Sequence, residues 1–414
     1  MSDFVIVGAG LAGAKAAEAL REQGFDGRVI LVGAEAHRPY ERPPLSKGYL
    51  SGKSDREKVF VHTEDWYAEH RVEFTAERSV TAIDRAAHRV EFADGTSIGY
   101  DKLLLTTGSS PRRLTVPGAD ADGVHHLRTL DDSDALRDLL ARVNRLVVIG
   151  AGWIGLEVTA AARQAGVEVT VVETAALPLL RVLGTEAAQV FADLHTAQGV
   201  EFRFGASIER VRTADGRVTG VTLADGTDVP AEAVLVGVGA APNTGLAEAA
   251  GLAVDNGVLV DAGLRTEDPD VYVAGDLANA EHPLLGRRIR VEHWANALKQ
   301  PRTAAANMIG GNATYDDLPY FYTDQYDLGM EYVGYVEPGE YDQVVFRGDV
   351  PGREFIAFWL KDSRVLAGMN VNVWDVTDPI KALIRSGAAV DPARLADPAV
   401  ALTEVVPGSS PSAP

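Results

Sequence analysis

The sequence predicts an α/β fold in which two parallel-sheet domains precede a smaller α+β domain. Two βαβ patterns, 142 residues apart and each with a glycine-rich turn, predict the parallel sheets. From about Pro319, aromatic and β-branched runs alternate with turn signals, which predicts a mostly antiparallel C-terminal domain. A chain of 414 residues, 46% of them apolar, is long enough for two or three such domains.

The first βαβ pattern begins almost at the N-terminus. Its strand, glycine turn, helix and second strand are expected at residues 4–7, 8–13, 14–23 and 28–32. Gly8 permits a tight turn, Gly10 lets the backbone approach a pyrophosphate, and Gly13 allows the helix to pack closely on the strand. The helix N-terminus then faces the phosphates. Glu35, 22 residues after Gly13, is the expected acceptor for ribose hydroxyls, so the pattern predicts a dinucleotide site.

The second pattern repeats the first. The equivalent elements are expected at residues 146–149, 150–155, 156–165 and 167–172. Gly150, Gly152 and Gly155 occupy the three glycine positions, and Glu173 directly ends the second strand. A 2′-phosphate would be repelled by Glu173, and residues 174–176 supply no arginine to attract one. This site is therefore expected to prefer NADH over NADPH.

Shorter elements are expected between and after these units. The predicted hairpins pair residues 89–93 with 97–100, and 218–223 with 229–236. A short apolar strand at 103–105 ends at the turn 106–108, and residues 234–238 with Gly239 resemble its counterpart in the second unit. The C-terminal strands are expected at 332–336, 343–346, 354–360 and 365–367, followed by a helix near 380–386. The last eight residues, 407–414, lack core-forming side chains and are expected to be disordered.

Composition excludes several classes of function. The chain has no cysteine, so it can form no disulfide, thiolate zinc site or Cys-ligated iron–sulfur cluster, and it has no dithiol redox centre. A formal charge of −20 argues against binding to nucleic acid or to an anionic membrane surface. The longest apolar run, 146–156, has 11 residues, which is too short to span a membrane. The nine histidines form no metal-ligand pattern, so no metal is expected.

Two dinucleotide sites in one chain have an economical explanation. One site holds a flavin dinucleotide, and the other delivers hydride from nicotinamide to it. The alternative is two separate nucleotide-regulated domains with no shared chemistry.

Two further strings lead to a family resemblance. Residues 39–47 combine prolines with Arg42 and Lys47, and residues 266–276 end in a Gly-Asp pair. With both glycine turns, the 106–108 turn and residues 324–326, they make the chain similar, from residue 4 to about 403, to flavin-dependent ferredoxin reductases that serve bacterial oxygenases. These are the reductases of the putidaredoxin reductase and biphenyl-dioxygenase reductase type.

The resemblance implies a glutathione-reductase-like architecture. It comprises two Rossmann-like dinucleotide-binding domains and a C-terminal α+β interface domain. The FAD-binding domain is expected at residues 1–112 and 242–316, the NAD-binding domain at 113–241, the C-terminal domain at 317–403, and a disordered tail at 404–414.

The resemblance also implies the residues that hold the two cofactors, FAD and NADH. The flavin contacts would fall on Gly8, Gly10, Ala12, Gly13, Glu35, Arg42, Lys47, Val80, Thr107, Gly108, Arg128, Asp276 and Trp294. The NADH contacts would fall on Gly150, Gly152, Ile154, Gly155, Glu157, Glu173 and Gly239.

Lys47 and Glu157 are the expected catalytic pair. Glu157 lies in the first turn of the second nucleotide-binding helix, near the place where nicotinamide would enter. In the family the lysine lies close to the reactive nitrogen of the flavin and pairs with this glutamate. A positive charge there would stabilise the reduced, anionic flavin. The alternative is that both are ordinary solvated charges.

The expected electron acceptor is an iron–sulfur ferredoxin that takes single electrons and passes them to a haem monooxygenase or a Rieske-type dioxygenase. Without cysteines, the electrons must leave directly from the flavin. Residues 287–302 contain five cations and one acid, a net charge of +4 that could attract an acidic ferredoxin. The docking hypothesis assigns this role to Arg287, Arg288, Arg290, Lys299 and Arg302. The alternative is a solvated helix end.

The leading prediction is thus an FAD-dependent ferredoxin–NAD(+) reductase in the cytoplasm, a monomer or a weak dimer. One alternative is a related flavoprotein that reduces a small acceptor, such as monodehydroascorbate or a quinone. Another is a flavoprotein that senses NADH and signals through a conformational change.

Overall fold

The computed structural model describes residues 2–406. The chain divides into two compact units. The first comprises the chain up to Pro44 together with Ser54–Ser110 and Ala240–Asp317, and the second comprises Leu45–Lys53, Pro111–Gly239 and the chain from Leu318. The short strands β8 (Ser109–Pro111) and β17 (Ala240–Pro242) lie where the chain passes between the units.

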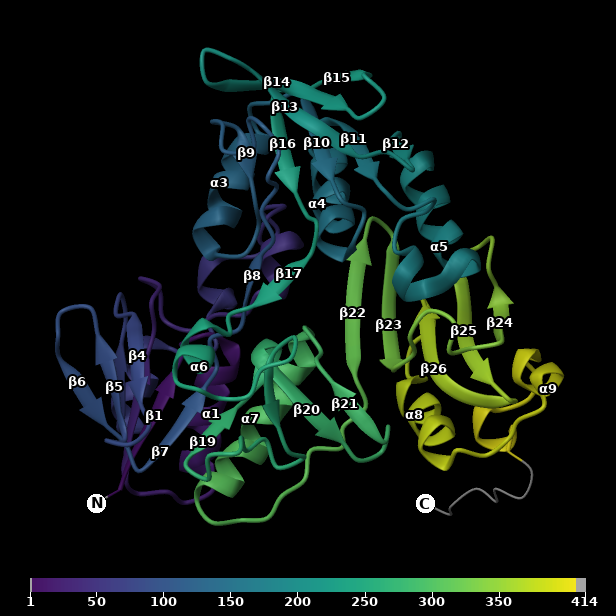
Figure 1. Cartoon of the computed structure of the whole chain (residues 1–414). Coiled ribbons are helices and arrows are strands. Elements are labelled where there is room, and N and C mark those ends of the chain that lie inside the picture. The colour runs from purple at the N-terminus through teal and green to yellow at the C-terminus, as the bar shows by residue number, and fades with distance from the viewer. Residues whose placement is uncertain (1, 407–414) are drawn as a thin grey trace. The chain divides into compact units, whose positions relative to one another are not determined.

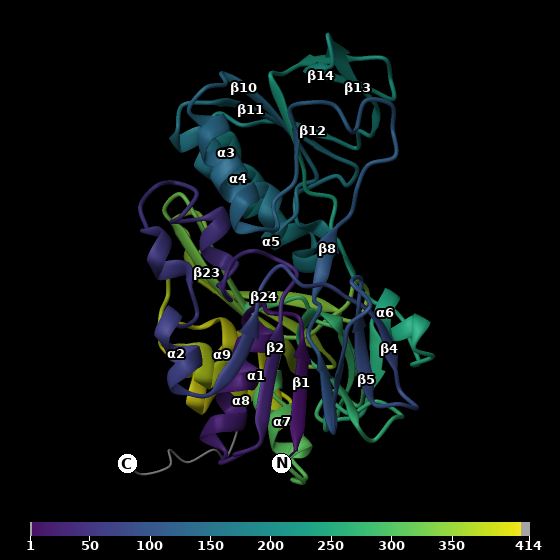
Figure 2. The same cartoon turned by 90° about the vertical axis from the view of Figure 1, so that its left-hand side faces the viewer.

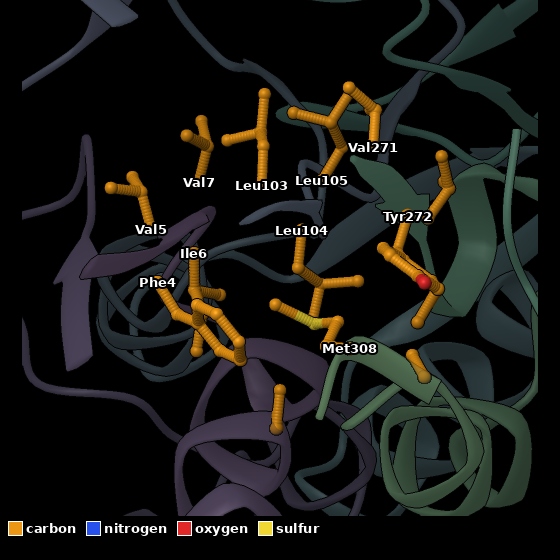
Figure 3. Close-up of a cluster of buried hydrophobic side chains, with 14 of the residues drawn as sticks. Phe4, Val5, Ile6, Val7, Leu103, Leu104, Leu105, Val271, Tyr272 and Met308 are labelled. Atoms are coloured by element: carbon orange, nitrogen blue, oxygen red, sulfur yellow. The ribbon is translucent and has the colours of Figure 1, made fainter. Parts of the chain in front are cut away.

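A five-stranded parallel sheet forms the centre of the first unit. Its strands, in the order β19-β7-β1-β2-β3, are Val271–Val273, Lys102–Leu105, Asp3–Val7, Arg28–Val32 and Val72–Thr75. Except for the edge strand β3, the strands are apolar and buried along most of their length, as expected for a parallel sheet that is covered on both faces. Residues of β1, β7 and β19 meet Met308 in the core, as Figure 3 shows.

Helices and smaller sheets complete the first unit. Helix α1 (Leu11–Glu22) packs against α7 (Trp294–Met308) and contacts both β1 and β2. Two three-stranded sheets follow the orders β4-β5-β6 and β18-β20-β21. The strands of these sheets are Val80–Asp84, Arg89–Phe92, Ser97–Gly99, Val258–Val260, Ala278–His282 and Arg287–Ile289. The short helices are α2 (Glu64–Glu69), α6 (Gly245–Ala249), η2 (Arg56–Val59) and η3 (Gly275–Leu277), and η1 (Pro43–Ser46) leads into the second unit.

The second unit contains another five-stranded parallel sheet. Its strands, in the order β12-β11-β10-β16-β9, are Glu201–Phe204, Glu168–Glu173, Arg145–Ile149, Ala233–Val236 and Val124–His125. Helix α4 (Trp153–Gln164) packs against β10 and β11 (Figure 2). The remaining helices of this region are α3 (Leu130–Leu140) and α5 (Leu180–Ala197). An antiparallel sheet is formed by β13 (Ile208–Ala214), β14 (Arg217–Leu223) and β15 (Asp228–Pro230).

The C-terminal part of the second unit is an antiparallel sheet with helices beside it. The strands, in the order β22-β23-β26-β25-β24, are Tyr320–Gln325, Leu328–Gly334, Arg364–Val371, Glu354–Lys361 and Gln343–Asp349. Helix α8 (Thr377–Ser386) packs against β23 and β26, and α9 (Pro392–Ala396) lies at β24 (Figure 1). The short helix η4 covers Leu402–Glu404. Three of the four predicted strands and the predicted helix fall within these elements. The predicted strand 332–336 overlaps β23 but extends two residues beyond its end at Gly334, and β22 is an additional strand.

One hydrophobic core joins the two parts of the second unit. Leu146 and Val148 of the parallel sheet share a buried cluster with Phe321 and Trp359 of the antiparallel sheet. The indole N–H of Trp359 donates a hydrogen bond to the carbonyl of Leu183 in α5 (3.1 Å). The two parts are therefore expected to depend on each other for stability.

One predicted strand is wrong. Residues 229–236 were expected to pair as one strand of a hairpin, but they divide into β15 and β16, which belong to different sheets. Only β15 pairs with β14. Pro230 ends β15, because proline has no N–H to continue the ladder, and Ala231 and Glu232 then lead into the parallel sheet.

Two further predictions concern membranes and the tail. Within residues 2–406, every helix is too short or too polar to cross a membrane. The predicted disordered residues 407–414 lie outside the described residues.

Candidate functional site

The first glycine turn has the geometry of a phosphate-binding loop. Gly8 has φ 113°, and a Cβ there would lie 2.3 Å from the carbonyl oxygen of Thr106. A Cβ on Gly13 would lie 2.0 Å from the carbonyl oxygen of Gly8, so both positions require glycine for the protein's own packing. A Cβ on Gly10 would meet nothing within 4 Å. The space above Gly10 is thus open beside the N-terminus of α1, where a pyrophosphate would bind.

The second glycine turn repeats this geometry. Gly150 has φ 99°, and a Cβ there would lie 2.4 Å from the carbonyl oxygen of Gly237. A Cβ on Gly155 would lie 2.2 Å from the carbonyl oxygen of Gly150, whereas one on Gly152 would meet nothing within 4 Å. In both turns, the first and third glycines are required by packing and the middle one leaves room for a ligand. The residues present therefore fit a dinucleotide at each turn.

The predicted ribose acceptor Glu35 lies in a polar cluster. Its carboxylate accepts hydrogen bonds from the hydroxyl of Tyr40 and from the guanidinium of Arg42 (3.0 Å). The backbone N–H of Arg78 donates to the carbonyl of Gly33 (2.8 Å), which brings the segment leading to Val80 beside the end of β2. Three predicted flavin residues, Glu35, Arg42 and Val80, thus come from one region of the first unit.

The Gly-Asp segment lies against the start of α1. Gly275 has φ 80°, and a Cβ there would lie 3.2 Å from the Cβ of Ala12. The carboxylate of Asp276 accepts a hydrogen bond from Ser109 (2.8 Å). Ser109 directly follows the turn that contains Thr107 and Gly108, so two predicted flavin-binding segments meet at the first glycine turn.

His293 and Trp294 mark the start of α7, close to Asp276. Trp294 is the first residue of α7. Burial lowers the pKa of His293 to about 4, while the negative charge of Asp276 opposes this shift. His293 is therefore neutral at physiological pH.

Two predicted flavin residues, Lys47 and Arg128, belong to the second unit. The backbone N–H groups of Arg128 and Thr129 both donate to Asp132 (3.0 and 2.8 Å), and the hydroxyl of Thr129 accepts from the N–H of Asp132 (3.1 Å). This capping box fixes the chain at Arg128 where α3 begins.

Glu173 is positioned at the end of β11 by its own hydrogen bonds. Its carboxylate accepts from the N–H groups of Ala151 and Ala175 (both 2.8 Å) and from the hydroxyl of Thr174 (3.0 Å). The charge of Glu173 therefore lies beside the second glycine turn. Ile154, in the first turn of α4, is 44% exposed there.

Gly239, the last of the predicted NADH contacts, follows β16 with φ 98°. Its carbonyl accepts a hydrogen bond from the N–H of Arg112 (2.9 Å). Gly239 is the last residue of the segment Pro111–Gly239, which belongs to the second unit.

The structure pairs Lys47 with Glu157. Their charged atoms are 2.8 Å apart, and Glu157 is only 3% exposed. The carboxylate also accepts hydrogen bonds from the hydroxyls of Ser46 and Thr323, the latter at 2.6 Å. A buried carboxylate needs such partners, because burial without them is costly. The amino group of Lys47 lies 5.4 Å from the ring centre of Tyr322. Burial raises the pKa of Asp324, and the positive charge of Lys47 opposes this shift.

Sequence reasoning missed the residues that complete this site. Ser46, Thr323 and Gln325 were not assigned a role, although Phe321, Thr323 and Gln325 occupy every second position of β22 and share its buried face. That alternation is a signal that the sequence contains. Helix α4 packs against β22 (Figure 1), so the side chain of Thr323 can reach Glu157.

The predicted docking cations are largely paired with acids. Arg288 lies 2.6 Å from Glu281, Lys299 lies 3.2 Å from Asp317, Arg302 lies 2.8 Å from Glu22, and Arg290 pairs with Glu292. Three of these acids lie outside residues 287–302, so the surface is closer to neutral than the net +4 of the sequence segment. The guanidinium of Arg290 also donates to the carbonyl of Asp276 (3.2 Å) and is only 11% exposed, which indicates a structural role.

Residues 2–406 contain no cluster of three or more His, Asp or Glu side chains that could hold a metal ion.

Comparison with known proteins shows the family to which the chain belongs. The sequence pattern of the family described as pyridine nucleotide-disulphide oxidoreductase matches residues 2–301. The chain belongs to the pyridine nucleotide-disulphide oxidoreductases. A second match, described as reductase C-terminal, covers residues 320–406.

Individual members of this oxidoreductase family resemble the chain over nearly its whole length. The ferredoxin–NAD(+) reductase component of the anthranilate 1,2-dioxygenase system of Burkholderia cepacia is 42% identical, over 96% of this chain and 98% of the relative. Putidaredoxin reductase of Pseudomonas putida is 39% identical, over 98% and 96%. The structure of a covalent putidaredoxin reductase–putidaredoxin complex matches with a TM-score of 0.95 at 38% identity, over 99% of each chain.

These matches confirm the family resemblance and the predicted α/β fold class with its α+β C-terminal part. Members of this oxidoreductase family use FAD and NAD(H), as predicted. The family's name refers to disulphides, but this chain has no cysteine, so it has no disulfide of its own to reduce.

Proposed function

We propose that the protein is an FAD-dependent NADH:ferredoxin reductase that supplies electrons to an oxygenase. The observation that carries this proposal is the pair of matching glycine turns in a chain without cysteine. When bound, FAD supplies the chemistry that converts a two-electron hydride transfer into single-electron release. Because no dithiol can act as a relay, the electrons must pass to a separate acceptor. Relatives named as ferredoxin reductases of oxygenase systems support the choice of acceptor.

Each cofactor has a set of residues that would hold it. In the first unit, Gly8, Gly10 and Gly13 with the start of α1 would bind the FAD pyrophosphate, and Glu35 its ribose. In the second unit, Gly150, Gly152 and Gly155 would bind NADH.

The nicotinamide would meet Lys47 and Glu157, whose buried ion pair keeps a positive charge in a fixed place. Such a preorganised charge stabilises negative charge that develops during the reaction. Glu173 would reject the 2′-phosphate of NADPH, because its carboxylate is held beside the second glycine turn.

The test is an anaerobic stopped-flow experiment with the holoenzyme. NADH should reduce the flavin rapidly and NADPH slowly, and mixing the reduced enzyme with candidate ferredoxins should reduce at least one of them. Failure to reduce any ferredoxin, together with rapid reduction of a quinone or monodehydroascorbate, would assign the small-acceptor function instead.

We also propose that exposed cations of residues 287–302 dock the ferredoxin. Arg302 supports this best, because its side chain is 69% exposed and the acid beside it, Glu22, is itself half exposed. Exposed ion pairs contribute little stability, so carboxylates of an acidic partner can replace Glu22. Arg290 is left out of this proposal because it is buried against Asp276.

Charge reversal tests the docking surface. Arg302→Glu should raise the Michaelis constant for ferredoxin several-fold by slowing encounter, and it should leave ferricyanide reduction unchanged. Arg265→Glu is a matched control, because Arg265 is 51% exposed and also pairs with an acid, Asp261, in the same unit. Equal loss with ferredoxin and ferricyanide, or an equal effect of the control, would contradict the docking proposal.

A further inference from the structure

A chain of buried hydrogen bonds leads from Glu157 to His195 in the second unit. The hydroxyl of Thr323 donates to Glu157 (2.6 Å), and the side-chain amide of Gln325 donates to the hydroxyl of Thr323 (3.2 Å). The amide oxygen of Gln325 lies 2.7 Å from Nε2 of His195. The hydroxyl of Tyr326 lies 3.3 Å from Nδ1 of His195 and ends the chain.

From Glu157 to His195 the chain is shielded from water. Thr323 and Gln325 are each 1% exposed, and His195 is fully buried. His195 lies in the last turn of α5, and the two polar residues share the buried face of β22 with Phe321. Buried polar groups are normally satisfied by partners, and water cannot replace a missing one here. Each member therefore depends on the next.

The hydrogen bonds of the chain have one direction. A carboxylate only accepts, so Thr323 must donate to Glu157 and accept from the amide nitrogen of Gln325. The amide oxygen of Gln325 then faces His195, so Nε2 of His195 must carry the proton and Nδ1 must accept from Tyr326. An ionised Glu157 thus requires one tautomer of His195.

The reverse direction requires a different charge on Glu157. If the amide of Gln325 turned over, its oxygen would accept from Thr323, and Thr323 would have no proton left for Glu157. The hydroxyl oxygen of Thr323 would then be satisfied only by a protonated Glu157. The tautomer of His195 and the protonation of Glu157 are therefore linked through two side chains.

We propose that His195 is a positioning residue which, through Gln325 and Thr323, holds the hydrogen-bond chain in the direction that keeps Glu157 ionised beside Lys47. Among the groups around the chain, the positive charge of Lys47 favours an ionised Glu157, and the carboxyl group of Asp324 opposes it. The hydroxyl of Tyr326 faces His195. Burial lowers the pKa of His195 to about 4, so its imidazole is neutral and can act as donor and acceptor at once.

The catalytic consequence rests on the proposed function, in which Lys47 and Glu157 meet the nicotinamide. A neutral Glu157 would leave Lys47 without its ion-pair partner. The tests therefore measure the protonation of Glu157 and His195 directly, by NMR of the isotope-labelled holoenzyme, and do not need turnover. Failure of NADH to reduce the wild-type flavin would contradict the proposed function and leave these measurements intact.

The first measurement is the ¹⁵N spectrum of histidine-labelled holoenzyme, with His195 assigned by its loss in His195→Gln. We expect a neutral ring protonated at Nε2 throughout the physiological range. A ring protonated at Nδ1 would overturn the proposal, because the chain would then run in the opposite direction.

The second measurement is the pH midpoint of the ¹³C carboxyl signal of Glu157, assigned by its loss in Glu157→Gln. Thr323→Val removes one donor at nearly constant volume and should raise this midpoint by roughly one pH unit, a tenfold change in the ionisation constant. His195→Leu should raise it in the same direction, because the amide of Gln325 is then free to turn over.

The double variant separates positioning from packing. If His195 acts through Thr323, His195→Leu adds nothing once Thr323→Val is present, so the double variant should titrate like Thr323→Val alone. His195→Gln and Thr323→Ser keep the donors and should restore the wild-type midpoint. Additive shifts, or no shift in His195→Leu, would overturn the proposal.

Thr159→Val is the matched control. Thr159 is also fully buried and lies on the same helix as Glu157, but its hydroxyl donates to the backbone carbonyl of Gly155 (2.7 Å). We expect this variant to leave the Glu157 midpoint unchanged. If His195→Leu does not fold, the Thr323 pair and the wild-type tautomer still decide the question.

Discussion

At the scale of single residues, Glu157 shows how a buried charge is kept. Its carboxylate lies 2.8 Å from Lys47 and accepts from two hydroxyls, so nearly all of its hydrogen-bonding capacity is used inside the protein. An ion pair in such a place contributes little net stability, because desolvation offsets the attraction. Breaking it is costly, since one charge is then left alone.

The first prediction follows from this asymmetry. Lys47→Met should lower the free energy of unfolding by about 3 kcal/mol, because it leaves Glu157 buried without its cation. It should also slow flavin reduction by NADH on the order of 100-fold. Denaturant titration and stopped-flow absorbance are the measurements.

Two controls accompany this variant. Lys47→Arg keeps the charge and should lose less stability and less of the rate of flavin reduction than Lys47→Met. Adding Glu157→Gln to Lys47→Met should recover stability without recovering the rate. A wild-type rate in Lys47→Met would contradict the proposed role of the charge.

The second prediction concerns pH. Burial lowers the pKa of His195 and that of His293 to about 4 each, below the value near 6.5 of an exposed histidine. Between pH 6.5 and 4 the unfolded chain therefore binds more protons at these sites than the folded protein. Above pH 6.5 both residues are neutral in both states. They therefore lower the free energy of unfolding only as the pH drops below 6.5.

The measurement is the free energy of unfolding at several pH values. Each histidine should contribute a slope of about 1.4 kcal/mol per pH unit between pH 6 and 4.5. Each of the variants His195→Gln and His293→Gln should show a slope that is smaller than that of the wild type by the amount that one proton contributes. An unchanged slope in either variant would mean that this histidine is protonated in the folded protein.

At the scale of elements, the two glycine turns separate packing from binding. In each turn, the first and third glycines face backbone atoms closer than 2.5 Å from a hypothetical Cβ, and the middle glycine faces open space. A neighbouring pair of variants at the start of one helix can therefore test the two roles independently.

The third prediction uses this pair. Gly152→Ala should fold with nearly wild-type stability but bind NADH at least tenfold more weakly, because its methyl group enters the space for the pyrophosphate. Gly155→Ala should lose about 1–3 kcal/mol of stability, because its methyl group would meet the carbonyl of Gly150 at 2.2 Å. Thermal unfolding and NADH titration distinguish the two outcomes. Equal destabilisation by both substitutions would contradict the assignment of Gly152 to a ligand.

Elements also show where sequence patterns fail. Residues 229–236 resemble one β-branched strand, yet Pro230 divides them between an antiparallel hairpin and the parallel sheet. Each half does form a strand. The choice of partner strand depends on contacts far away in the sequence, which no local pattern contains.

At the scale of the whole molecule, one hydrophobic core extends through both parts of the second unit. Trp359 of the antiparallel sheet is fully buried, and its indole N–H binds the carbonyl of Leu183, which precedes the kink of α5 at Gly184. The segment predicted to bind NADH is thus stabilised by residues from the C-terminal part of the chain.

The fourth prediction tests this dependence. Trp359→Ala should lower stability by about 3–5 kcal/mol through loss of buried contacts, and Trp359→Phe by about 1–2 kcal/mol through the lost hydrogen bond. Hydrogen exchange should accelerate in β10 of the parallel sheet as well as in β25. Trp374→Phe is the control, because Trp374 in the same unit is 54% exposed. Exchange that changes only in the antiparallel sheet would contradict a common core.

The local sequence pattern was sufficient to predict the two βαβ units, their glycine turns and the acids that follow them. These features depend on steric rules that act within about 30 residues, so they can be recognised without knowing any distant contact. The absence of cysteine is likewise a property of the chain itself. It rules out an internal dithiol relay whatever the arrangement of the domains.

Which side chains form ion pairs and hydrogen bonds with one another, by contrast, depends on the folded chain. Ser46, Lys47 and Thr323 reach Glu157 from distant parts of the sequence, and His195 joins them through Gln325. The docking cations likewise meet acids that their own sequence segment does not contain. Burial and Coulomb attraction depend on distance in space, and tertiary contacts alone define that distance.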